Sequence, residues 1–335
     1  MSHETDPSVA LVIPAKNAER TLEQCLRSVL PWQESGMLSE VILVDDGSTD
    51  DTADIARRLG AQVLSAHGKG RGAARNLGWR HAASDLVWFI DSDCVAEPDA
   101  LERLLALFRD SAVAGAGGSY GIAEEETLLA RLIHEEIVER HLRMPLRVNF
   151  LGSFNVMYRR SVLEQVGGFN EELLLAQDAE LAYRVRKHGG ALAFDIRSKV
   201  KHYHPTALLP YLRKQAGQGY WRVQLYHLHP ERAGGDSYST WSDHVQPPMA
   251  MASIGMLPFL CIDGMEWLPL LAVLLTALLQ LPMTLALVRR LDCTYLSYAG
   301  LGFLRAYARG FGLSLGTLTL LNARRGKVAW MPSAQ

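Results

Sequence analysis

Short apolar runs alternate with amphipathic segments over the first two thirds of the chain. Residues 9–15 (VALVIPA) and 41–44 (VILV) have the composition of buried strands, and each precedes a polar loop and a segment with apolar residues at helical spacing. Residues 61–66 and 85–90 are two further apolar runs of this kind. Strands that alternate with helices predict an α/β fold with a doubly wound, mostly parallel sheet, whose ligands bind beyond the carboxyl ends of the strands.

The composition changes at about residue 235. A stretch rich in Gly, Ser and Pro is expected to form a linker over 236–248, between an α/β domain at 1–235 and a membrane-associated helical region at 249–335. Residues 268–288 contain no charged side chain. As a helix they would span about 32 Å, enough for a bilayer core of about 30 Å.

A shorter apolar segment, 249–262, lies upstream. We expect it to be the first half of a helical hairpin, although a re-entrant segment or a buried helix would also fit its length. Arg289 and Arg290 follow the second helix, and such charges favour the cytoplasmic side. The polar first ten residues contain no signal-peptide core, so the first domain is expected to face the cytoplasm. The alternative is a buried hairpin of a soluble protein.

Two arginines interrupt the last apolar stretch, 296–321. Arg305 and Arg309 predict an interfacial helix whose guanidinium groups reach toward a polar surface, rather than a third membrane crossing. Arg324 and Arg325 add positive charge expected on the cytoplasmic side.

Composition narrows the class of partner. A formal net charge of −2 leaves no basic footprint for nucleic acid, and none is expected as a partner. The four cysteines, Cys25, Cys94, Cys261 and Cys293, have no C-x-x-C spacing. They argue against a disulfide framework or a zinc site and favour a reducing compartment.

Carboxylates follow two of the predicted strands. Asp91 and Asp93 come directly after the fourth strand, and residues i and i+2 of an extended chain point the same way, so both side chains could reach one cation. A surface turn is the alternative, because Asp and Ser are common turn residues. Asp45 and Asp46 follow the second strand, where they would bind a base or ribose, or only form a turn before a helix. Both pairs are expected at one edge of the sheet.

Five segments in order resemble the family-2 inverting nucleotide-sugar glycosyltransferases. They cover much of residues 9–205: VIPAKNAERTLEQCLRSVL, VILVDDGSTDDT, GRGAARNLG, FIDSDC and GSFNVMYRRSVLEQVGGFNEELLLAQDAELAYRVRKHGG. The resemblance implies a GT-A fold, a nucleotide-diphosphate sugar donor, and a divalent cation, Mn²⁺ or Mg²⁺, held through the D-x-D motif. Carboxylate and phosphate oxygens are ligands that both cations prefer.

The resemblance implies a metal site around the D-x-D motif. Asp93 is expected to be the more direct ligand, with Asp91 on the ribose or on the water shell of the metal. His202 or His204 would complete the site, as a histidine does in related enzymes. Without the resemblance, either histidine would be interpreted as structural.

The resemblance also implies a nucleotide site. Asp45 and Asp46 correspond to an acidic pair of which one residue contacts the base or ribose. Pro14 and Ala15 begin a loop that would line the nucleotide, and Arg75 corresponds to a basic contact near the base and phosphate.

The acceptor side is expected in the second half of the domain. Asp178 corresponds to the catalytic base, although a carboxylate favoured at a helix N-terminus would account for it as well. Gln177 stands where an acid is common, and Asn155 matches the acceptor-side loop. Trp221 would line the acceptor groove or touch lipid headgroups.

The expected function is therefore that of a membrane-anchored, metal-dependent, inverting glycosyltransferase. It would transfer one sugar to a lipid-linked or cell-envelope glycan acceptor at the cytoplasmic face of a membrane. The segment RKQAGQGYWR does not have the order of the Q-x-x-R-W motif of polymerising relatives, which favours transfer of a single sugar. The alternatives are a polyprenyl-phosphate sugar synthase and a non-catalytic membrane scaffold that binds a nucleotide sugar.

Overall fold

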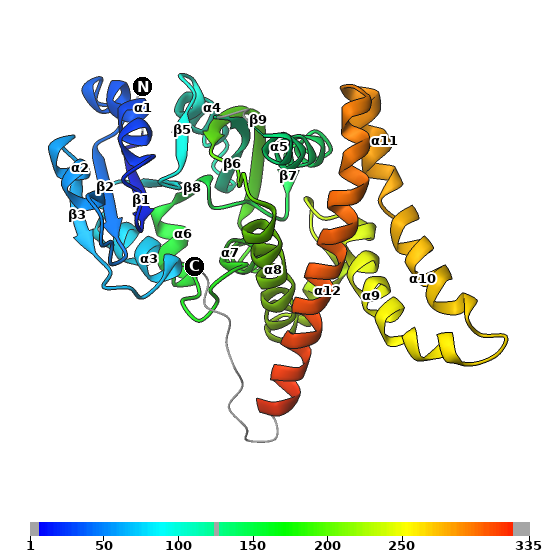
Figure 1. Cartoon of the computed structure of the whole chain (residues 1–335). Coiled ribbons are helices and arrows are strands. Elements are labelled where there is room, and N and C mark those ends of the chain that lie inside the picture. Colours follow the sequence, from blue (N-terminus) through cyan, green and yellow to red (C-terminus); the bar gives the residue numbers. More distant parts are fainter. Residues whose placement is uncertain (1–6, 124–126, 324–335) are drawn as a thin grey trace. The chain divides into compact units, whose positions relative to one another are not determined.

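The computed structural model describes residues 7–123 and 127–323 of the chain (Figure 1). Two compact units make up the protein: a first unit of Met1–Glu125 with His141–His204, and a second of Glu126–Arg140 with Pro205–Gln335. Most of helix α5 therefore joins the second unit, although its sequence lies inside the expected α/β domain.

The first unit is built on a nine-stranded sheet in the described part of the chain, with the order β3-β2-β1-β4-β8-β6-β9-β5 and β7 paired to β9. Its strands are β1 (Val9–Ala15), β2 (Glu40–Asp45), β3 (Gln62–Ser65), β4 (Leu86–Ile90), β5 (Cys94–Ala96), β6 (Val113–Ile122), β7 (Arg147–Val148), β8 (Asn155–Arg159) and β9 (Ala191–His202).

The sheet is parallel where the amino-terminal strands lie. Strands β3, β2, β1 and β4 pair in parallel, and so do β6 and β9. Strand β8 enters antiparallel between β4 and β6, while β5 and β7 pair antiparallel with β9. The predicted doubly wound α/β sheet is confirmed, and its parallel half carries the strands that precede the two acidic pairs.

Both faces of the sheet are covered because its strands are apolar on both sides. Along β1, Val9, Leu11 and Ile13 enter one core, and Ala10 and Val12 enter the other. Helices α1, α2 and α4 pack on the first face and α3, α6 and α7 on the second. These helices are α1 (Leu22–Glu34), α2 (Thr52–Arg58), α3 (Arg71–His81), α4 (Ala100–Leu107), α6 (Arg160–Val166) and α7 (Gln177–Lys187).

The second unit is helical. It contains α5 (Leu128–His141, apart from its last residue), α8 (Leu208–Leu228), α9 (Trp241–Gly255), α10 (Trp267–Leu278), α11 (Leu281–Arg290) and α12 (Tyr298–Ala323), with the short 3₁₀ segments Pro230–Gly234, Leu257–Cys261 and Cys293–Ser297. The expected linker at 236–248 is wrong for most of its length. Thr240 and Asp243 form a capping box that starts α9 within it, and the composition rich in Gly, Ser and Pro had hidden this helix start.

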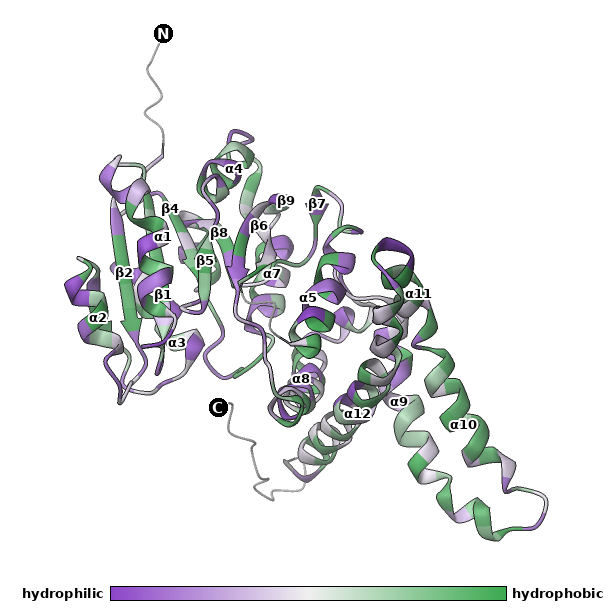
Figure 2. Cartoon of the chain, turned by 45° about the horizontal axis from the view of Figure 1, so that its top comes forward, coloured by the Kyte–Doolittle hydropathy of each residue, from purple (hydrophilic) through white to green (hydrophobic). Residues whose placement is uncertain are grey.

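One apolar helix in the described chain is long enough to cross a membrane. Trp267–Arg290 spans 24 residues across α10 and α11 with a mean hydropathy of 2.2, and only 28% of its most apolar window is buried. Figure 2 shows this helix as a green arm beside α9. Helix α9 packs against α10, so the expected hairpin exists. Its first arm is shorter, because α9 ends at Gly255 and a 3₁₀ turn follows.

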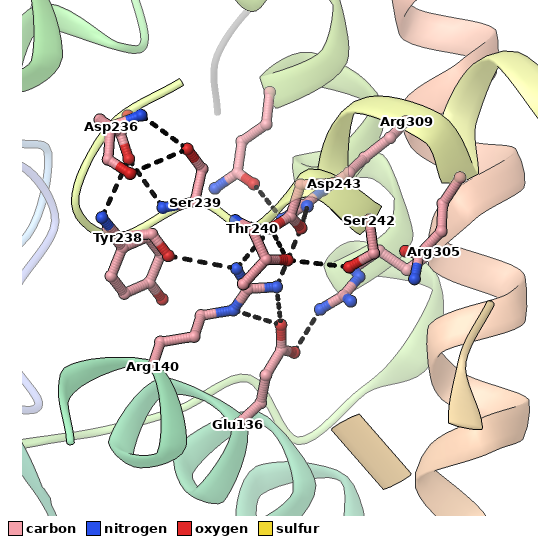
Figure 3. A network of polar contacts seen from close by, with 12 residues as sticks. Glu136, Arg140, Asp236, Tyr238, Ser239, Thr240, Ser242, Asp243, Arg305 and Arg309 are labelled. Atoms are coloured by element: carbon pink, nitrogen blue, oxygen red, sulfur yellow. Dashed lines mark hydrogen bonds and ion pairs between the residues drawn. The ribbon is translucent and has the colours of Figure 1, made fainter. Parts of the chain in front are cut away.

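The expectation of a polar surface is wrong for Arg305. Arg305 is 2% exposed and pairs with Glu136 of α5, while Arg309 pairs with Asp243 of α9 and keeps 24% of its side chain exposed (Figure 3). Glu136 therefore holds the Arg305 guanidinium inside the unit. Arg324 and Arg325 lie outside the described residues.

Helices α8 and α12 approach each other at glycines. A Cβ at Gly312 would overlap the carbonyl oxygen of Ala216, and one at Gly219 would overlap that of Arg309. The close approach brings the side chains that flank these glycines into contact between the helices. Gly300, at the start of α12, has no atom within 4 Å of its Cβ position.

We expect opposite effects from the same substitution at these two glycines of α12. Gly312→Ala should lower the free energy of unfolding by about 1–3 kcal/mol, because the backbone of α8 must move away. Gly300→Ala should leave stability unchanged or raise it by about 0.5–1 kcal/mol, since alanine favours the helix. Thermal unfolding of both full-length variants in one detergent measures the difference, and equal melting temperatures would contradict the proposed close packing.

Candidate active site

The loops after β1 and β2 are tied together at the carboxyl edge of the sheet. Pro14 and Ala15 are buried at the end of β1, and Ala15 is in register with Asp45 of β2. Asn17, whose φ of 51° is in the left-handed region, donates its backbone N–H to Ser48 Oγ at 2.9 Å. The two loops therefore form one wall of the edge where both acidic pairs lie.

The two acids after β2 have different surroundings. Asp45 is half-buried, and its Oδ1 accepts a hydrogen bond from the backbone N–H of Ser48 at 3.0 Å. Asp46 is buried, and both carboxylate oxygens accept from the N–H of Gly70, at 3.0 and 3.1 Å. Gly70 immediately precedes α3, so Asp46 fixes the start of that helix, while Asp45 stays accessible to a ligand.

Arg75 of α3 lies at the centre of the candidate site. It is 3% exposed, and its Nη2 forms an ion pair with Asp91 Oδ1 at 2.6 Å. Its Nη1 donates to Gln177 Oε1 at 3.4 Å, and its guanidinium lies 5.5 Å from the ring centroid of Phe169. Its Nε is buried and has no hydrogen-bond partner in the described structure. Arg75 thus brings the D-x-D segment and the first residue of α7 to one guanidinium.

Asp178 stands in the first turn of α7. The chain reverses sharply before it, because Ala176 has a φ of 62° and Gln177 is anchored by donating its side-chain amide to the carbonyl of Leu173. The half-buried Asp178 carboxylate accepts from the N–H of the next residue at 2.8 Å. Burial, and then the charge of Asp178, raises the pKa of the buried Tyr158 phenol. Asp178 thus directly follows Gln177, the residue whose side chain Arg75 contacts.

The second acid of the D-x-D motif faces a histidine. Asp93 Oδ2 is 3.4 Å from His202 Nε2, and the Nδ1 atoms of His202 and His204 are 3.1 Å apart. Strand pairing creates this geometry, because Cys94 of β5 is in register with His202 of β9. The structure brings Asp93, His202 and His204 together, as predicted for a metal site, although their ligand roles stay predictions.

The side chains around Asp93 supply only part of the ligand set that a divalent cation requires. No group of three or more His, Cys, Asp or Glu side chains in the described chain is arranged to hold a metal ion. Asp93 and His202 nevertheless bring an oxygen and a nitrogen within 3.4 Å of each other, a donor pair that suits Mn²⁺ or Mg²⁺ if ligand oxygens supply the other positions. His204, bonded through Nδ1, would then orient His202 instead of binding the cation.

An aromatic residue that the sequence analysis missed, Tyr120, lies beside the two histidines and stacks on Phe154. The rings of Tyr120 and Phe154 stack with centroids 3.5 Å apart, and Tyr120 lies 4.9 Å from His202 and 5.8 Å from His204. Tyr120 is the one large aromatic residue in β6, after a run of small residues. This difference in size is the signal in the sequence that could have indicated a functional position.

Two residues predicted on the acceptor side, Asn155 and Trp221, are buried. Asn155 is fully buried in β8, where its Oδ1 accepts from the Trp88 indole at 3.0 Å and its amide donates to Ser198. These bonds use the side-chain amide inside the sheet, and the acceptor-side role of Asn155 stays a prediction. Trp221 lies in the second unit on α8, 5% exposed and packed against Tyr220, so it does not present a groove surface.

Curated relatives share the first part of the chain. The pre-mycofactocin glycosyltransferase of Mycobacterium tuberculosis is 30% identical over 67% of this chain, but that match spans 48% of the relative. This chain thus spans about half the length of that relative. The O-antigen chain rhamnosyltransferase WbaN of Salmonella anatum is 29% identical over 66% of this chain and 72% of its own length.

Solved structures extend the similarity of fold. Mannosyltransferase PcManGT from Pyrobaculum calidifontis, in complex with GDP-Man and Mn²⁺, covers 92% of this chain with a TM-score of 0.59 and 16% identity, and 88% of that chain is matched. Glucosyl-3-phosphoglycerate synthase from Mycobacterium tuberculosis, with Mn²⁺ and UDP-glucose bound, has a TM-score of 0.50 and 22% identity, over 66% of this chain and 79% of that one. Residues 10–167 match Glycosyl transferase family 2, so the chain contains a domain of that family.

Proposed function

We propose that the chain is a metal-dependent, inverting glycosyltransferase that moves one sugar from a nucleotide-diphosphate sugar to a lipid-linked or cell-envelope acceptor. The observation that carries the proposal is the position of Arg75, which pairs with Asp91 and also reaches Gln177. This contact puts the D-x-D segment next to the turn that presents Asp178. A donor-side acid and an acceptor-side base then share one site.

The donor half of the proposal concerns the leaving group. Asp93 and His202 would hold the divalent cation, with His204 fixing the imidazole. When bound, the cation would offset the negative charge that develops on the departing nucleoside diphosphate. Asp45 would contact the ribose or base from the wall formed by Pro14 and Ala15. Asp46 is assigned a positioning role, since Gly70 already occupies its carboxylate.

The acceptor half assigns one proton transfer to Asp178. The acceptor hydroxyl oxygen would attack the anomeric carbon and form the new C–O bond on the face opposite the diphosphate. The bond between that carbon and the diphosphate oxygen would break, and the hydroxyl proton would pass to the Asp178 carboxylate. One such displacement inverts the configuration. Gln177 contributes no second carboxylate and would keep the turn in place through Arg75 and Leu173.

The acceptor class is inferred from the second unit. Its single long apolar helix in the described chain exposes large aliphatic side chains such as Leu270 and Leu274. Figure 2 shows the hydrophobic colour of this helix. Such a surface suits the interior of a bilayer. An enzyme bound there meets an acceptor with an apolar tail at the membrane surface, and we place the catalytic unit on the cytoplasmic side.

Asp178→Asn should separate donor binding from catalysis. Because the amide keeps the shape of the side chain but cannot take the proton, we expect unchanged donor affinity and a kcat lower by about 10²–10⁴-fold. The measurement uses full-length protein with Mn²⁺ or Mg²⁺, a panel of nucleotide sugars, and membrane lipids as acceptors. Glu172→Gln, an exposed acid on the same segment, is the control and should behave like wild type. Nucleotide binding without transfer by any of the three proteins would instead favour the scaffold.

His202→Ala should weaken the metal site directly. We expect the affinity for Mn²⁺ in the presence of UDP to fall by about 10–100-fold, and His204→Ala to have a smaller effect in the same direction. Electron paramagnetic resonance of free Mn²⁺ gives the affinity without any sugar transfer. His188→Ala replaces an exposed histidine and serves as the control. Equal Mn²⁺ binding by all four proteins would remove His202 from the site.

A further inference from the structure

The second unit buries charged side chains that the proposed chemistry does not use (Figure 3). Arg140 of α5 pairs with Glu136 one turn earlier at 2.8 Å, and two of its nitrogens lie 2.6 and 2.9 Å from the carboxylate of Asp243 on α9. Arg305 of α12 pairs with the other oxygen of Glu136 and donates to Tyr298 Oη at 2.8 Å. Three helices are linked through these contacts.

Arg309 gives this group an excess of positive charge. Its guanidinium donates to the neutral side chains of Gln215 and Gln218, at 2.7 and 3.3 Å. Its ion pair, at 3.2 Å, is with Asp243, whose carboxylate Arg140 already holds at shorter distances. Glu136, Arg140, Asp243, Arg305 and Arg309 form what we call the arginine cluster, and among these described residues three guanidinium groups face two carboxylates.

Both carboxylates of the arginine cluster carry their charge at neutral pH. Burial alone would raise their pKa values, but Arg305 and Arg140 hold the pKa of Glu136 well below its usual range. Arg140 and Arg309 do the same for the pKa of Asp243. Neither carboxylate is protonated at neutral pH, so the three arginines and two acids of the cluster have a net charge of +1.

The excess charge is accessible and incompletely satisfied. The Arg309 side chain is 24% exposed, while those of Arg140 and Arg305 are almost completely buried. In addition, Arg305 Nε is buried and has no hydrogen-bond partner in the described part of the chain. A buried charge without a full set of partners is costly, so the unbonded Nε of Arg305 and the net charge of the cluster both favour an anion bound beside Arg309.

We propose that the arginine cluster binds a phosphate group through Arg309, and that this phosphate belongs to a lipid. A phosphate accepts two parallel hydrogen bonds from one guanidinium and supplies the missing negative charge. The exposed aliphatic side chains of α10, in the same unit, offer a surface for the apolar tail of such a lipid. The inference rests on the proposed function, because it identifies the lipid-linked acceptor as one that carries phosphate.

The test compares Arg309→Gln with wild type, as full-length proteins in phosphatidylcholine nanodiscs. The probes are farnesyl phosphate, farnesol and inorganic phosphate. Glutamine can still bond Gln215 and Gln218, and it leaves two guanidinium groups facing two carboxylates, so the variant should keep its melting temperature. We expect its dissociation constant for farnesyl phosphate to rise by about tenfold or more, with no change for farnesol.

Arg290→Gln is the matched control. Arg290 lies in the same unit, but its charge is balanced by Glu135 at 2.6 Å and Glu139 at 3.1 Å. Its loss should leave farnesyl phosphate binding unchanged. An Arg309→Gln defect that is equally large for inorganic phosphate would support the phosphate site but identify free phosphate as the ligand. Wild-type affinity of Arg309→Gln for all probes would overturn the proposal.

Binding of UDP with Mn²⁺ is measured on the same samples. Nucleotide binding by all proteins, together with loss of farnesyl phosphate binding in Arg309→Gln alone, supports both proposals. Absence of nucleotide binding in every protein would overturn the proposed function, even where the Arg309→Gln defect is present. The two failures are therefore distinguishable.

Discussion

The first unit depends on a single buried cation. Arg75 has almost no access to solvent, so its charge must be matched inside the protein, and Asp91 supplies the match. This requirement holds the end of β4 against α3, while the contact with Gln177 holds α7 against the same helix. A strand end and a helix start that are far apart in sequence are positioned by one guanidinium. The turn before Asp178 adjoins that pair, whereas the pairing of β5 with β9 sets the positions of Asp93 and His202.

The second unit pairs its buried charges in a network across several helices, whereas the first unit pairs Arg75 with one acid. Its arginines and acids come from helices α5, α9 and α12, and the close glycine contacts of α8 with α12 bring Gln215 and Gln218 to Arg309. Nearly all groups are paired, but the sum is not zero. Buried ions are costly unless they are paired, so the excess charge at the partly exposed Arg309 is consistent with a ligand that is absent from the network itself.

Local patterns in the sequence predicted the parts of the fold that depend on local causes. Alternating apolar runs gave β1, β2, β3 and β4, and the position of acids after strands placed Asp45 and Asp91 at one edge. The sequence did not indicate contacts between residues that are distant along the chain. Arg305 is 169 residues from Glu136, and Asn155 is 67 residues from Trp88, so no window around either residue contains the group that buries it. The linker was misplaced because composition outweighed the capping signal at Thr240.

The hydrogen bonds from Gly70 to Asp46 affect how mutants of this protein are to be interpreted. Asp46 lies next to the wall formed by the loops after β1 and β2, so a loss of activity on its replacement would be attributed naturally to a lost ligand contact. Its carboxylate, however, secures the first residue before the helix that carries Arg75. A defect at this acid would thus be transmitted along α3 as a displaced guanidinium. A loss of activity in an Asp46 variant would therefore report on the position of α3. A structure with the donor bound would be needed to assign Asp46 to donor binding.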